Sequence, residues 1–159
     1  MSNSVTESIY ASILIEGSKL AETLWEKSLM IWLAGKDQSI VGLGCVAIDI
    51  TLLGWSKSQF SNQKGFLLNV MHKVMINKTW QQFQLNEEIG LAKTLIIKEI
   101  LNELSIEHVK FRELEFMFNN EAYSVWEKCD IHRVYLNHIP DLLGNRCLIC
   151  NILNDREDN

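Results

Sequence analysis

The sequence predicts an all-α protein, a single-domain helical bundle of about five to seven helices. Two observations lead to this prediction. The only proline among the 159 residues is Pro140, so no earlier segment is interrupted by a proline ring. Apolar residues also recur every three to four positions in several segments, which is the spacing of one helix face. We find no repeat or linker within residues 1–153, which we take as one domain followed by a polar tail at 154–159.

Residues 5–34 predict the first helix. Its apolar stripe consists of Val5, Ile9, Ile13, Leu20, Leu24 and Ile31. Ser4, followed three residues later by Glu7, matches a capping box, and Gly35 stands where a helix would end. Gly17 lies within the stripe and marks either a close crossing with another helix or a break into two helices.

Two segments are compatible with helix or strand, and we favour helix for both. Residues 38–55 contain no turn signal, but many of them are β-branched, so any short β element would lie within 41–51. In residues 109–118, Phe111, Leu114 and Phe118 share a helix face, whereas the alternation of apolar residues there also fits a strand.

The serine-rich segment 56–65 predicts a loop, and residues 66–83 are again periodic. Asn86 is a predicted N-cap, and Glu87 and Glu88 suit the positive end of the helix dipole. The helix that follows has an apolar stripe that we expect to face the core: Ile89, Ala92, Ile96 and Ile100, widened by Leu91, Leu95 and Leu104.

The C-terminal part predicts a helix over 123–139 that ends before Pro140, because the residue preceding a proline avoids the α region. Gly144 and Asn145 then turn the chain, and residues 141–153 form a last short helix or strand.

Charge and composition narrow the class of protein. With 47% apolar and 22% charged residues the chain falls in the globular range, and its net charge is −5. Lys and Arg are scattered rather than clustered, so we do not expect a nucleic-acid partner. No signal peptide or apolar run long enough to span a bilayer is visible, so we expect a cytoplasmic protein with reduced cysteines.

Three of the four cysteines and two of the four histidines lie within residues 128–153. Cys129 and His132 are separated by two residues, as are Cys147 and Cys150, and two such pairs are the usual ligand pattern of structural zinc. His138 is an alternative to His132. The residues inside each pair are largely apolar, however, and free cysteine is commonly buried. We therefore favour core cysteines close to one another and no cofactor, with a zinc site as the alternative.

Arg133 and His138 are separated by four residues. This spacing resembles the motif of HEPN-domain ribonucleases, small all-helical proteins in which such arginine and histidine residues act on RNA. The resemblance covers six residues and implies a ribonuclease that uses Arg133 and His138. The alternative is a solvated arginine and an unrelated histidine.

Trp25 and Trp32 are seven residues apart and share a helix face with Leu29. These residues are candidates for binding a protein partner, a ligand or a second copy of the chain, but ordinary core packing is the interpretation that we favour for this face. No phosphate-binding, nucleophile-elbow or di-iron motif occurs. The sequence thus favours a non-enzymatic, acidic interaction protein, such as an adaptor, a chaperone or an immunity-type binder. The alternatives are a zinc- or ligand-binding domain and the ribonuclease.

Overall fold

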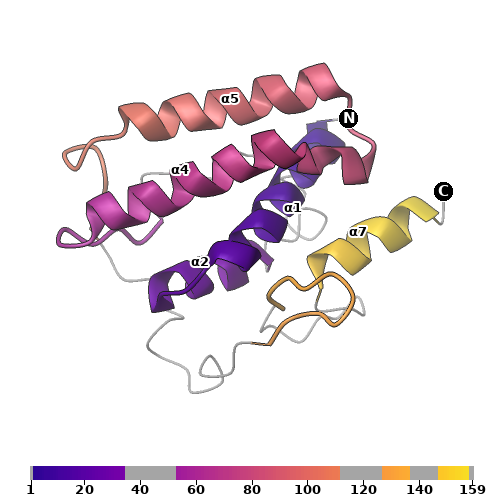
Figure 1. Ribbon diagram of the computed structural model, residues 1–159, viewed down its shortest axis with the longest axis horizontal. Helices are drawn as coiled ribbons and strands as arrows, with labels where there is room; N and C mark the ends of the chain where they lie inside the picture. Colours follow the sequence, from indigo (N-terminus) through magenta and orange to yellow (C-terminus); the bar gives the residue numbers. More distant parts are fainter. Residues whose placement is uncertain (1, 35–52, 112–126, 137–146, 158–159) are drawn as a thin grey trace.

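The computed structural model describes residues 2–34, 53–111, 127–136 and 147–157, which form a helical bundle (Figure 1). Its elements are α1 (Ser2–Leu20), α2 (Leu24–Ala34), α4 (Phe60–Asn77), the 3-10 helix η2 (Thr79–Phe83), α5 (Glu87–Glu103) and α7 (Leu148–Glu157). The predicted all-α class is confirmed, since the described residues contain only two isolated β-bridges and no strand. No helix in these ranges is long and apolar enough to cross a membrane.

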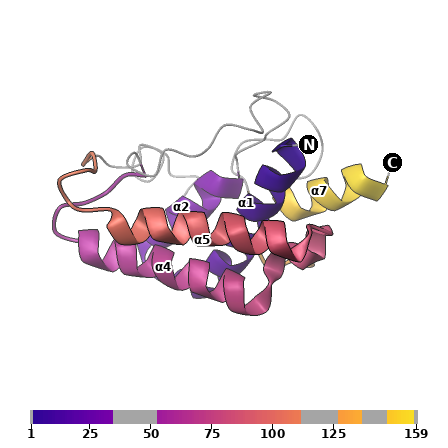
Figure 2. The same ribbon diagram turned by 90° about the horizontal axis from the view of Figure 1, so that it is seen from above.

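Helix α1 is the centre of the bundle. Every residue from Ser8 to Ser18 is buried, so the helix is covered on all sides. It packs against α2, α4, η2, α5 and α7. Helices α4 and α5 lie side by side along one face of it (Figures 1 and 2).

The predicted helix over 5–34 is two helices. The break lies after Leu20, and α2 restarts with a capping box that we did not predict. Thr23 Oγ1 accepts from Glu26 N at 3.2 Å, and Glu26 Oε1 accepts from Thr23 N at 3.0 Å. Ser4, the predicted N-cap, lies inside α1, because the polar residues before it continue the helix to Ser2.

Gly17 marks a close crossing and not the break. A Cβ atom at this position would lie 2.3 Å from Met30 Sδ on α2. The absence of a side chain therefore allows α1 and α2 to pack with the Met30 side chain directly on the α1 backbone.

Helix α4 begins at Phe60, so the predicted loop over 56–65 was wrong in its second half. Phe60, Gln63 and Leu67 are buried on one side of the helix, and the two polar residues that follow Phe60 are exposed. Gln63 is polar but satisfied, because its Oε1 accepts from Ser56 N at 3.0 Å.

Helix α5 has the predicted N-cap, since Asn86 Oδ1 accepts from Glu88 N at 2.8 Å. The predicted orientation of its apolar stripe was wrong. Ile89, Ile96 and Ile100 are 43%, 50% and 46% exposed, whereas the buried residues are Gly90, Thr94 and Leu101. A Cβ atom on Gly90 would lie 2.4 Å from the Trp80 ring, so this tight contact requires the small residues of α5 to face inward.

The structure describes only one end of each of the two segments, 38–55 and 109–118, that are compatible with helix or strand. Residues 53–55 and 109–111 are not helical, and Trp55 and Phe111 form an isolated parallel bridge. The predictions for residues 38–52, including a β element in 41–51, and for residues 112–118 fall outside the described residues.

Candidate metal centre

The first half of the site is a tight turn at residues 127–136. Cys129 N donates to Val134 O at 2.8 Å, and Arg133 N donates to Cys129 O at 2.8 Å. Arg133 has a left-handed backbone with φ 57°, which closes the turn. Lys128 and Tyr135 pair as an antiparallel bridge on either side of it.

This turn shows that the helix predicted over 123–139 was wrong for its described part. The spacing of Cys129, His132 and Leu136 fits a helix face, but it comes from a hairpin in which Val134 and Tyr135 are buried. Ile131, which a helix would have brought beside this face, is 77% exposed at the tip of the turn. The predicted helix end before Pro140 and the turn at Gly144 and Asn145 lie outside the described residues.

The second half of the site is the first turn of α7. Asn151 N donates to Cys147 O at 3.1 Å, so Cys147 is the residue that precedes the first helical turn. Cys150 N donates to Cys147 Sγ at 3.5 Å, which places the sulfur in the position of a capping acceptor. Cys147 and Cys150 thereby lie on the same side of the helix terminus. Residues 154–157, which we expected in a frayed tail, belong to α7.

The two halves meet, and their four candidate ligand atoms all lie within 4.8 Å of one another. His132 Nδ1 is 3.8 Å from Cys129 Sγ, 3.7 Å from Cys147 Sγ and 3.3 Å from Cys150 Sγ. Cys129 Sγ and Cys150 Sγ are 3.8 Å apart, and all three cysteines are free thiols. The sequence prediction that Cys147 and Cys150 return beside Cys129 therefore agrees with the geometry.

The cysteines differ in how strongly they resist ionisation. Burial raises the pKa of the Cys147 thiol to about 12. Burial also acts on Cys129, but the backbone N–H groups of His132 and Ile131 oppose it and leave the pKa of this thiol below its usual value. Backbone amides thus point at the Cys129 sulfur, although the intervening residues are not glycine.

The turn is attached to the C-terminal end of α1 by the residues that flank it. Lys128 Nζ donates to Ser18 O at 3.0 Å and lies 4.9 Å from the centre of the Tyr135 ring. Tyr135 N donates to Ser18 Oγ at 3.3 Å. Val134 and Ile149 are buried in the same core as α1, so the turn and α7 are part of the bundle (Figure 1). No sequence signal identified Ser18 and Lys128 as anchors.

The predicted binding residues Trp25 and Leu29 lie in the core. The Trp25 ring packs against Trp55 and Phe66, with centroids 5.8 and 6.3 Å apart, and its Nε1 donates to Gly54 O at 3.0 Å. Their burial corresponds to the core alternative and leaves no free surface at these two side chains. The side chain of Trp32 is outside the described residues.

The predicted ribonuclease pair is not brought together in the part of the chain that the structure describes. Arg133 is exposed in the tight turn, and His138 lies beyond the described residues. Comparison of the chain with models of known families, curated protein sequences and solved structures finds no match. Function is therefore inferred from the geometry of the cysteine and histidine cluster.

Proposed function

We propose that the chain binds one zinc ion through Cys129, His132, Cys147 and Cys150, and that the ion has a structural role. The separations between the ligand atoms carry this proposal. Tetrahedral zinc with Zn–S bonds of about 2.3 Å and a Zn–N bond of about 2.0 Å requires S···S and S···N separations of about 3.8 and 3.5 Å. The corresponding separations in the cluster are 3.8 Å for Cys129 and Cys150, and 3.3 to 3.8 Å from His132 Nδ1.

The chemistry of the donors favours zinc over the other readings of the cluster. Three thiols and an imidazole suit a borderline-soft ion that prefers four ligands. Ordinary core packing does not require an imidazole nitrogen to face three sulfur atoms at once. A disulfide between Cys129 and Cys150 would need the sulfur atoms to lie about 2.05 Å apart, which is far below the observed 3.8 Å.

The apolar residues between the ligands argue against zinc, whereas the backbone donors around the sulfur atoms argue for it. Ile131 points into solvent, and its backbone amide is directed to Cys129 Sγ. Cys150 N is likewise directed to Cys147 Sγ. Backbone donors that face the sulfur atoms stabilise thiolates, and a dication removes much of the desolvation penalty that raises the pKa of Cys147.

Four protein ligands leave no open position on a tetrahedral ion, so this site would not activate water or substrate. The proposed role is to hold the turn at 127–136 against the first turn of α7. This supports a non-enzymatic protein over an enzyme that uses the cluster.

Native mass spectrometry tests the zinc proposal. We expect one zinc per chain in the wild type and none in Cys147→Ser. Cys45→Ser is the matched control, because Cys45 is the one cysteine of the chain that is not among the proposed ligands, and this variant should retain the ion. Thiol alkylation supplies a second readout, because the ligands should react only after a chelator is added. A metal-free protein whose thiols stay protected with and without chelator would show that the cysteines are simply core.

A second candidate function is self-association through α5, and we infer it from the exposed residues of that helix. Ile89, Ile96 and Ile100 repeat at spacings of seven and four and form one stripe in solvent. In an antiparallel pair centred on Ile96, Lys93 of one copy would face Glu99 of the other, so the charges beside the stripe are complementary. We therefore keep the proposal of an acidic interaction protein. Its contact surface would be the exposed stripe of α5 and not the face of Trp25 and Leu29.

Light scattering over a range of concentrations tests this second candidate. We expect the wild type to dimerise and Ile96→Glu to remain monomeric. Ile76→Glu, at an exposed position of α4, is the control and should leave dimerisation unchanged. A wild type that stays monomeric at all concentrations would exclude self-association through α5.

A further inference from the structure

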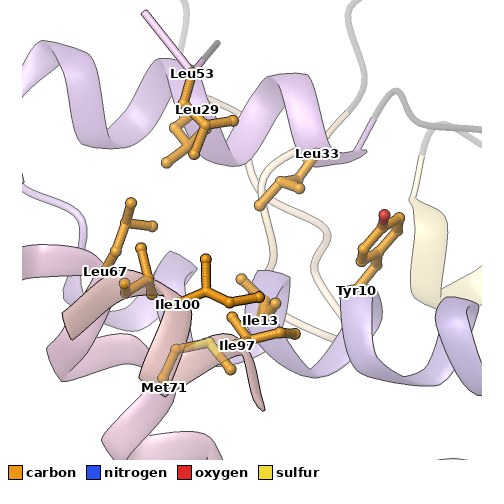
Figure 3. Close-up of a pocket in the computed structure, with 10 residues that line it drawn as sticks. Tyr10, Ile13, Leu29, Leu33, Leu53, Leu67, Met71, Ile97 and Ile100 are labelled. Atoms are coloured by element: carbon orange, nitrogen blue, oxygen red, sulfur yellow. The ribbon is translucent and has the colours of Figure 1, made fainter. Parts of the chain in front are cut away.

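An apolar cavity of about 150 Å³ lies between α1, α2, α4 and α5, and it is partly open to solvent beside Ile100, which is 46% exposed. Leu29 and Leu33 of α2 line one side of it (Figure 3). Leu67 and Ile100 lie across from them, from α4 and α5, and Ile13 of α1 lies beside these two (Figure 3). The cavity is far from the cysteine and histidine cluster in the sequence and shares no residue with it.

Protein interiors are packed to crystal-like density, and voids larger than a water molecule are few. A cavity of this volume therefore leaves many side-chain atoms without packing partners, and any apolar occupant would regain those contacts. Water is a poor occupant, because it needs two to four polar partners that such a lining does not offer.

The lining determines the chemistry of the ligand. Among the described residues that line the cavity none carries a charge, and the Tyr10 hydroxyl is the one polar side-chain group. A charged or strongly polar ligand would lose its hydrogen bonds to water without replacement. Apolar cavities of about this volume bind molecules the size of benzene.

We propose that this cavity is a binding site for a small, uncharged, apolar molecule of about the size of benzene. Leu33 of α2, Ile13 of α1 and Leu67 of α4 form three of its walls. The site is independent of the zinc proposal, since none of the four candidate metal ligands contributes to the lining.

Thermal unfolding of the full chain with and without benzene tests the proposal. At a benzene concentration about five times Kd we expect the melting temperature to rise by about 2–4 °C. Ile13→Phe and Leu67→Phe each place a larger side chain into the cavity from a different wall, and both should abolish the rise. Ile76→Phe makes the same change as the first variant on the exposed face of α4, where Ile76 is 59% exposed, and should keep the rise.

Two further measurements make the result decisive. Xenon NMR of the wild type requires no variant and should show a bound signal that benzene displaces. Hexanoate, which carries a charge, should give no rise in melting temperature. If neither benzene nor xenon binds, or if only hexanoate does, the proposal is wrong. The zinc content of the same samples is measured separately, so a failure of one proposal is distinguishable from a failure of the other.

Discussion

The Sγ atoms of Cys129 and Cys150 lie 3.8 Å apart although the two residues are 21 positions apart in the chain. The first belongs to a hairpin turn and the second to the first turn of α7, so their contact joins two elements of different kinds. His132 Nδ1 lies within 3.8 Å of both sulfur atoms. The predictions below follow from this junction and from the packing of the bundle that carries it.

Removal of zinc should loosen the turn and α7 but leave the bundle folded. The ion would cross-link the turn to α7, whereas α4 and α5 pack against each other without it. Hydrogen exchange after chelation should therefore show loss of protection at the amides of Cys129 and Asn151. The amide of Gly90 in α5, which donates to Asn86 O, should remain protected. Equal loss at all three amides, or at none, would contradict the proposed role of the ion.

Gly90→Ala should destabilise the protein because the added Cβ would lie 2.4 Å from the Trp80 ring. We expect a loss of about 1–3 kcal/mol in the free energy of unfolding, measured by urea denaturation. Gly65→Ala on α4 is the matched control, since nothing lies within 4 Å of its added Cβ. It should stabilise by about 0.5–1 kcal/mol through the higher helix propensity of alanine. Two variants with equal effects would show that the packing at Gly90 is not tight.

Glu16 is a buried carboxylate that links α1 to the end of α4. Its Oε1 accepts from Asn77 Nδ2 at 3.1 Å and its Oε2 accepts from Thr79 Oγ1 at 2.6 Å. Glu16→Ala removes the acceptor of both hydrogen bonds. We therefore expect a loss of about 2–3 kcal/mol in the free energy of unfolding, measured by urea denaturation. The exposed Glu99→Ala should change stability by less than about 0.5 kcal/mol. A loss no larger than that of this control would mean that Glu16 is dispensable.

The capping box at the start of α2 predicts a non-additive pair. Thr23→Ala and Glu26→Ala should each lower the free energy of unfolding by about 1 kcal/mol, because each leaves backbone amides without an acceptor. The double variant should lose less than the sum, since the two side chains act on the same helix end. Additive losses in a double-mutant cycle would show that the two side chains act independently and not as a coupled capping box.

Helix α5 shows what could be predicted from the sequence. Its boundaries follow from local signals, namely the Asn86 cap, the acidic first turn and the apolar periodicity, and these were confirmed. Which face is buried depends on Trp80, whose ring occupies the space that a side chain at Gly90 would need. That contact is tertiary, so apolar periodicity alone selected the wrong face.

At the candidate site the ligand residues could be predicted from the sequence, whereas the local backbone structure could not. The identities and spacing of Cys129, His132, Cys147 and Cys150 were available in the sequence, but the backbone that brings them together was not. The turn depends on a left-handed Arg133, a conformation that is uncommon for a residue other than glycine. It also depends on anchors at Ser18, more than a hundred residues earlier, since the hydrogen bonds from Lys128 and Tyr135 span 110 and 117 residues.

X-ray absorption at the zinc edge tests the central claim most directly, because it measures the ligands and their distances on the metal itself. The purified wild type should show three sulfur ligands at about 2.3 Å and one nitrogen ligand at about 2.0 Å. His132→Cys should convert the spectrum to four sulfur ligands, which identifies the nitrogen donor. A first shell that contains oxygen ligands, or a protein that retains no zinc after purification with zinc present, would contradict the account.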